Sequence, residues 1–161
     1  MAFEIAYDGP VTVTFDTVAQ GYSRDGCTVR IQPFWNDVKS DYSGGEQGPP
    51  ADTQFLGAIA TVNCDLTKYE LATVERLAST FDYGLTEGKV PLPGTLMRQE
   101  AKMKQLKLLG TKFTTTFETA FVRQATEFNA GVRAKFFRLS FECWMADYSA
   151  TRILMTLVPT P

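Results

Sequence analysis

Several stretches of this sequence alternate apolar and polar residues, and this alternation constrains the fold more than any other feature. In residues 11–15, VTVTF, the side chains of Val11, Val13 and Phe15 would lie on one side of an extended chain and the two threonines on the other. Successive side chains of a β-strand point to opposite faces, and β-branched and aromatic residues favour strands. The pattern predicts a half-buried strand.

Three later stretches repeat the pattern. Residues 113–122 alternate so that the odd-numbered positions, five residues from Phe113 to Phe121, are expected on one face. Residues 137–143 and 27–32 alternate in the same way, and the proline after residue 32 is expected to end that strand because it cannot donate to the ladder. The chain is therefore expected to be mainly β.

Residues 97–109 fit two structures. A helix there would end at Gly110, in the position where a glycine often terminates a helix, whereas the alternation of lysine and leucine suits a strand. We favour a strand over residues 104–109, because a second helix would leave the following strands short of a pairing partner. Residues 152–158 are expected to form the last strand.

One stretch predicts a helix. An apolar run that is typical of a buried strand is expected to turn at Cys64 and Asp65 into a helix over about residues 66–80. Thr67 and Glu70 have the spacing of a capping box. A lone helix among strands must pack its apolar stripe on a sheet. The residues expected to make this contact are Tyr69, Val74, Leu77 and Phe81.

Together these elements predict seven or eight strands and one helix in a single domain over residues 1–161. The connections between strands are short, which favours antiparallel pairing. The expected fold is an antiparallel β-sandwich or barrel with one flanking α-helix.

Residues 36–53, NDVKSDYSGGEQGPPADT, are expected to form one long early loop. Loops longer than about 12–15 residues are uncommon within a compact domain and tend to be functional or disordered. Two interpretations stay open: an insertion without consequence, or an arm that becomes ordered on meeting a partner. Phe34 and Trp35 at its root are expected to act as a hinge packed on the core.

The net charge of −2 hides an asymmetry along the chain and argues against bulk binding of nucleic acid. Residues 1–90 hold 13 acidic and 6 basic side chains, whereas residues 91–138 hold 3 acidic and 9 basic. Such a division arises from differently solvated faces, or from complementary surfaces that meet between copies of one chain.

Three cysteines without a close pair predict reduced, buried thiols and a protein made in the cytoplasm. The first residues, MAFEIAYDGP, lack a basic region followed by an apolar one, so no signal peptide is expected. No apolar run approaches the roughly 18 residues that a membrane span needs. A soluble protein without a membrane partner is expected.

The residue types that carry most chemistry are sparse. The sequence has no histidine, which removes Ser-His-Asp, Cys-His and histidine-containing metal sites. Gly44, Gly45 and Gly48 lack the lysine of a phosphate-binding loop, and their acidic neighbours do not have the spacing of a calcium-binding loop. We expect no enzyme activity, no metal and no cofactor.

Two stretches together resemble the tail-tube proteins of long-tailed bacteriophages. The first is FLGAIATVNCDL followed by TKYELATVERLAST, and the second is FTTTFETAFVRQATEFNAGVRAKFFRLSFECW. The likeness, which covers residues 54–144 and the loop before them, is a pattern of elements without a short diagnostic motif. The resemblance implies a β-sandwich with one flanking helix and a long early loop.

The resemblance also implies a function: a virion protein, assembled in the host cytoplasm, that forms hexameric rings stacked into the tail tube through which DNA passes. Its implied partners are further copies of itself, the tape-measure protein, and the tail terminator and baseplate proteins. The loop would contact the next ring through Asn36, Asp37, Lys39, Asp41, Tyr42, Glu46 and Asp52. Thr114, Thr116 and Glu118 would line the lumen, although Lys104, Lys107 and Lys112 make this region more basic than a DNA channel should be.

Three other functions stay open. Another phage structural protein, such as a tail terminator, a head–tail connector component or a capsid decoration protein, would close as a finite ring or bind as isolated oligomers. A monomeric β-barrel could bind an apolar ligand, if its phenylalanines left a cavity. A hydrolase using only carboxylates is disfavoured, because an exposed acidic loop does not raise the pKa of a carboxyl.

Overall fold

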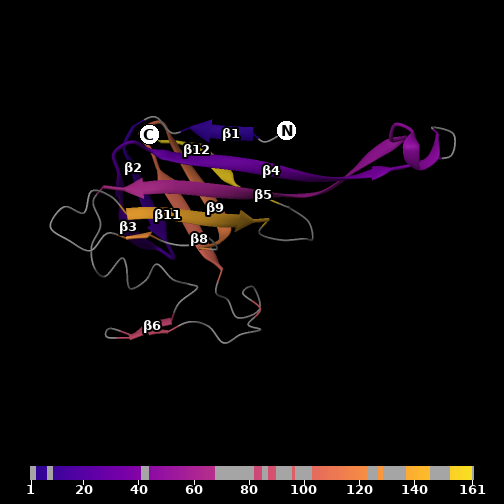
Figure 1. Ribbon diagram of the computed structural model, residues 1–161. Helices are drawn as coiled ribbons and strands as arrows, with labels where there is room; N and C mark the ends of the chain where they lie inside the picture. Colours follow the sequence, from indigo (N-terminus) through magenta and orange to yellow (C-terminus); the bar gives the residue numbers. More distant parts are fainter. Residues whose placement is uncertain are drawn as a thin grey trace.

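The alternating stretches pair into one large antiparallel sheet (Figure 1). The structure is a computed structural model, and it describes residues 3–6, 9–40, 44–67, 82–84, 87–89, 96, 103–122, 127–128, 137–145 and 153–160. The strands of this sheet follow the order β1-β4-β5-β11-β9-β8-β2-β3, with β10 paired to β11 and β12 paired to β9. A separate two-stranded sheet holds β6 and β7.

The bounds of the elements show how much of the described chain is extended. The strands are β1 (Phe3–Ala6), β2 (Val11–Phe15), β3 (Val18–Ser23), β4 (Cys27–Val38), β5 (Asp52–Leu66), β6 (Asp82–Gly84), β7 (Glu87–Lys89), β8 (Lys104–Leu109), β9 (Phe113–Val122), β10 (Glu127–Phe128), β11 (Phe137–Trp144) and β12 (Thr156–Pro159). In the described part of the chain the one helical element is a short 3₁₀ turn, η2 (Gly45–Gln47). The prediction of a mainly β, antiparallel fold is confirmed.

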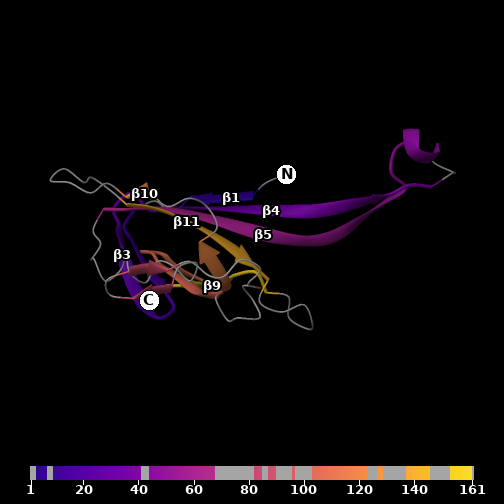
Figure 2. The same ribbon diagram turned by 60° about the horizontal axis from the view of Figure 1, so that its bottom comes forward.

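The sheet folds back so that its two halves face each other across the core (Figure 2). One half holds β1, β4, β5 and β11, and the other holds β3, β2 and β8, with β9 running from one half to the other. The rings of Phe15 on β2 and Phe141 on β11 lie 5.3 Å apart between centroids, so the halves are in contact. At the end of β5, the Thr67 backbone N–H donates to the Tyr22 carbonyl of β3 at 2.9 Å, which ties the two halves together.

A β-bulge in β9 lets this strand serve both halves. Lys104 pairs with Ala120 and Leu106 with Phe117, so three residues of β9 span the length of two residues of β8. The extra residue reverses which side chains face the core. The odd-numbered Phe117 is buried before the bulge, and the even-numbered Ala120 is buried after it. The prediction that all odd-numbered residues of this strand share one face is therefore wrong.

Three of the predicted strands have the predicted bounds, the strand predicted over residues 137–143 is confirmed as β11 with one further residue, and two strands were misjudged at their ends. β2, β8 and β9 have the predicted residues. β4 continues through Pro33 to Val38, because β1 pairs with β4 only as far as Ile31 and a proline is tolerated on an edge. The last strand, β12, starts at Thr156, since residues 153–155 are not strand.

The predicted turn at Cys64 and Asp65 is wrong. Both residues lie in β5, where Cys64 pairs with Cys27 and Leu139, and Asp65 pairs with Arg138. β4 and β11 both pair with β5 at Cys64, and β11 alone continues the pairing to Leu66, so a helix cannot start at residue 66. Residues 68–80 of the predicted helix, with the predicted contact residues Tyr69, Val74, Leu77 and Phe81, lie outside the described residues.

All three cysteines are free and buried, as predicted. Cys27 and Cys64 face each other across β4 and β5. Burial raises the pKa of the Cys64 and Cys143 thiols, and the neighbouring Cys27 thiol raises the pKa of Cys64 further. Among the described residues, no helix is long and apolar enough to cross a membrane.

We expect native protein at pH 8 to react with a thiol reagent at none of its three cysteines, and unfolded protein at all three, because the three side chains are buried away from the reagent and burial disfavours the reactive thiolate of Cys64 and Cys143. The folded state also keeps the protons of Cys64 and Cys143, which the unfolded chain loses above about pH 8.5, so stability should fall as the pH rises beyond that value. Reagent titration with and without guanidinium, and urea unfolding from pH 7 to 10, measure the two effects. Fast labelling of the native protein would contradict the buried cluster.

Candidate functional site

A long two-stranded arm projects from the body of the protein (Figures 1 and 2). β4 pairs with β5 along the whole length of β4, but β11 pairs with β5 only from Ala60 onward, and β1 covers β4 only up to Ile31. Residues 32–59 therefore form a hairpin that no other described strand extends, and we call these residues the arm. An isolated two-stranded hairpin is only marginally stable in water.

The prediction of a loop over residues 36–53 is wrong at both ends. β4 runs to Val38 and β5 starts at Asp52, so residues 36–38 and 52–53 are strand, and the tip of the arm is residues 39–51, of which 39–40 and 44–51 are described and are not strand. Glycine and proline, which gave the stretch its loop-like composition, are confined to this tip, where η2 lies. The pairing within the arm is intramolecular, and the Ala51 backbone N–H closes the tip by donating to the Val38 carbonyl at 2.9 Å.

The arm exposes a pair of aromatic side chains. Trp35 and Phe55 are directly opposite each other, with ring centroids 5.1 Å apart in an edge-to-face arrangement, and they are 54% and 53% exposed. Trp35 lies on the same face of β4 as the buried Val29 and the partly buried Ile31. The apolar face that the other half of the sheet covers in the body therefore continues, uncovered, onto the arm.

A bulge joins the arm to the body. Phe34 pairs with Gly57 and Trp35 with Phe55, so Leu56 is the extra residue in β5. Gly57 has a φ of 144°, which L residues other than glycine rarely adopt, so the glycine supplies the backbone conformation of this joint. Phe34 and Leu56 are also exposed, so the expected packing of Phe34 and Trp35 on the core is wrong.

The residues predicted to contact the next ring lie along the outer part of the arm. Asn36 and Asp37 are exposed on β4, and the Asp37 carboxylate accepts the Thr53 hydroxyl at 3.3 Å. Asp52 begins β5, Glu46 lies in η2, and the Lys39 ammonium donates to the Gly48 carbonyl at 2.9 Å. The structure thus places five predicted residues on one arm; Asp41 and Tyr42 lie outside the described residues.

The predicted lumen residues share one face of β9, opposite the buried Thr115 and Phe117. Thr114 and Thr116 are partly exposed and Glu118 is exposed, and Gln105 donates to the Glu118 carboxylate at 2.9 Å. Their assignment to a lumen stays a prediction.

Strand pairing brings further side chains to this face. Leu109 and Val158 flank Thr114, whereas Lys107 and Thr156 flank Thr116. Lys104 is instead close to Asp16, with a nitrogen–oxygen distance of 3.8 Å. Leu109 and Val158 were not predicted for this face, because their place beside Thr114 depends on the register of the strands. The alternation of β8 shows only that Lys107 and Leu109 share a face.

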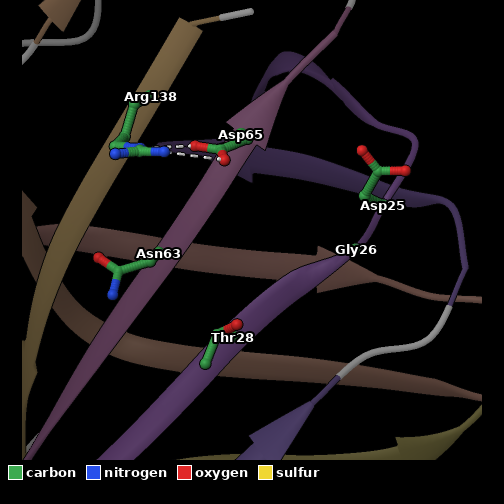
Figure 3. Close-up of a pocket in the computed structure, with 6 residues that line it drawn as sticks. All are labelled: Asp25, Gly26, Thr28, Asn63, Asp65 and Arg138. Carbon is green, nitrogen blue, oxygen red and sulfur yellow. Dashed lines mark hydrogen bonds and ion pairs between the residues drawn. The ribbon is translucent and has the colours of Figure 1, made fainter.

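An open polar depression of about 430 Å³ lies on the outer face of β4, β5 and β11 (Figure 3). The Arg138 guanidinium and the Asp65 carboxylate point toward each other across it, with contacts of 2.9 and 3.3 Å. The Ser140 hydroxyl donates to the Asn63 side-chain oxygen at 2.7 Å. These polar groups are paired with each other, and the exposed ion pair contributes little to stability.

Known proteins give no direct indication of function. No protein-family model matches this chain. No curated protein or solved structure matches it either. Among the described residues, no group of three or more acidic or cysteine side chains could hold a metal ion. The arm is therefore the feature of this fold that most needs a functional explanation.

Proposed function

We propose that this protein is a self-assembling structural subunit, the tail-tube protein of a long-tailed bacteriophage, and that its arm joins one ring of subunits to the next. The rings would be hexameric and would stack around a channel for DNA. The tape-measure, terminator and baseplate proteins would be its further partners. The subunit would be made in the host cytoplasm and end in the virion tail.

The uncovered aromatic pair on the arm supports this proposal most strongly. Burying a large apolar side chain contributes about 1.5–3 kcal/mol, and Trp35 and Phe55 both remain about half exposed in the single chain. Large exposed apolar groups on a protruding element are typical of protein–protein contact sites. A partner surface that covered this face would also stabilise a hairpin that is weak alone.

The open edges of the arm support assembly too. Beyond Ile31 and Ala60, β4 and β5 have no other described neighbour, so their outer backbone groups can pair with another strand. An arm that binds a different surface of an identical subunit makes a heterologous contact, and such contacts propagate unless the rotation closes a ring. In the subunit itself, we infer an open β-sandwich, because the two halves of the sheet face each other as layers.

A concentration series tests the proposal. We expect light scattering and negative-stain images of the purified protein to show rings and tubes of uniform bore that lengthen with concentration. A variant in which Asn-Gly replaces residues 33–58 closes the hairpin with a two-residue turn between the paired residues Gln32 and Ile59 and removes the aromatic pair, and we expect it to fold but not to form tubes. Circular dichroism and thermal unfolding serve as the fold control.

The other outcomes point to the other functions. A closed ring that never lengthens would favour a tail terminator, connector or decoration protein. A strict monomer at every concentration, or a shortened variant that still forms tubes, would contradict a tube held together by the arm.

A further inference from the structure

A second exposed apolar cluster lies at one corner of the body, where β8 turns into β9 and β12 runs beside them. Leu109, Phe113, Leu157 and Val158 are all exposed there, and we call these residues together with Lys107 and Lys112 the corner. Leu109 and Val158 lie beside Thr114, and Pro159 pairs with Phe113. The register places Leu109 and Val158 on the face of Thr114, and Phe113 and Leu157 on the opposite face. On the Thr114 face, two exposed apolar side chains therefore lie beside Lys107.

The corner is a fixed surface. The Gly110 backbone N–H donates to the Phe113 carbonyl at 3.0 Å, and the Thr160 backbone N–H donates to the Lys112 carbonyl at 2.9 Å. The Thr160 hydroxyl donates to the Gly110 carbonyl at 3.0 Å. These bonds hold the turn and the end of β12 together, so a partner would meet a preformed site and little ordering would oppose binding.

The charges of the corner and the arm are complementary. Within the described residues, Lys107 and Lys112 form no ion pair, whereas Lys104 has Asp16 nearby. The arm carries the carboxylates of Asp37, Glu46 and Asp52, which also form no ion pair within the described residues. The arm also carries one lysine, Lys39, but its acidic residues outnumber it. Both surfaces therefore combine exposed apolar side chains with a net charge, negative on the arm and positive on the corner, which favours their association and fixes its orientation.

The arm of one molecule cannot fill the corner of the same molecule. In both ribbon views the arm projects from one end of the body, and the C-terminal end of the chain lies toward the other (Figures 1 and 2). The corner is bonded to that C-terminal end through Thr160. A contact between arm and corner therefore joins two copies head to tail.

We propose that the corner is the docking site for the arm of a neighbouring copy of this chain. Trp35 and Phe55 of one copy cover Leu109 and Val158 on the Thr114 face of the corner, and the arm carboxylates lie near Lys107 and Lys112. This inference rests on the proposed function and names the surface that the arm binds. The corner ends the β8–β9 strands that carry the predicted lumen face, which places it where one ring would meet the next.

A charge exchange tests the pairing. We expect Lys107→Glu/Lys112→Glu to abolish tube formation, and Asp37→Lys/Asp52→Lys to do the same. The chain that carries all four substitutions should assemble again, since each reversed arm then meets a reversed corner. Arg24→Glu/Arg30→Glu is the control, because it changes the net charge as much as the corner variant does. These two arginines are exposed on β4 and in the turn before it, and this variant should assemble as the unchanged protein does.

Photo-crosslinking separates a failure of this inference from a failure of the proposed function. With p-benzoylphenylalanine in place of Phe55 in the full chain, we expect intermolecular crosslinks to residues 107–113 and 156–160. Crosslinks to another surface, normal assembly of the Lys107/Lys112 variant, or no rescue in the fourfold variant would overturn the corner assignment and leave the arm-mediated tube intact. The absence of any intermolecular crosslink at high concentration would overturn both.

Discussion

Replacing Trp35 and Phe55 by serine is expected to leave the subunit folded and to prevent its assembly. Neither side chain belongs to the buried core, so the body should keep its stability apart from the lost contact between the two rings. About half of each side chain is exposed in the single chain, so each subunit contact would lose about 1.5–3 kcal/mol for the two together, which weakens association by about tenfold to a hundredfold. Light scattering and negative stain across a concentration series measure the loss.

Leu96→Ser/Ile153→Ser is the matched control for this variant. It also removes two exposed apolar side chains, but these lie outside the arm and the corner. We expect the control to assemble at the same concentration as the unchanged protein. If both variants assembled equally well, the aromatic pair would have no role in assembly. If the control also failed, exposed apolar area in general would hold the assembly together, without a specific site.

The sequence predicted the strands whose patterns are local. Residues 11–15 and 113–122 alternate cleanly, and one side of each strand packs on the core and the other meets solvent over most of its length. The ends of β4 and β5 could not be predicted in this way. Both strands extend well past their alternating parts because the residues of one pair with those of the other, and pairing depends on contacts between distant parts of the chain.

Register also explains the errors within single strands. The bulge in β9 exchanges its two faces near Glu118, and nothing in the spacing of residues 113–122 reveals where that exchange occurs. Cys64 and Asp65 have a turn-like neighbourhood in sequence, yet β4 and β11 pair with the two sides of β5 at Cys64, and β11 continues the pairing at Asp65. Local propensity is a weak predictor wherever two neighbours complete a ladder.

The candidate site was predictable in part. The acidic residues of the arm were identified from composition, because a long polar stretch with little to bury stands out as a possible contact segment. The aromatic pair was missed as a surface, because Trp35 next to a predicted loop resembles a hinge residue and its partner Phe55 lies across the strand pair. The corner was also missed, since Leu109 and Val158 become neighbours only through β9.

Replacing Phe141 by alanine is expected to destabilise the subunit strongly. The side chain is fully buried and its ring contacts that of Phe15, which lies on the facing half of the sheet. Large-to-small substitutions of a buried phenylalanine cost about 3–5 kcal/mol, from lost burial and from the cavity that remains. Urea unfolding at concentrations where the protein is monomeric measures the change as a lower midpoint with an unchanged slope.

Phe113→Ala provides the comparison, because it removes the same ring from an exposed position on β9. We expect it to change the stability of the monomer by no more than about 0.5 kcal/mol and to leave assembly unchanged, because Phe113 lies on the face of the corner opposite Leu109 and Val158. Phe141→Ala should instead lower assembly in proportion to the unfolded fraction, and a stabilising osmolyte should restore it. Different responses of the two phenylalanines would separate a residue that holds the two halves of the sheet together from an exposed ring at the edge of the sheet. Equal losses of stability would mean that the halves do not meet at Phe141.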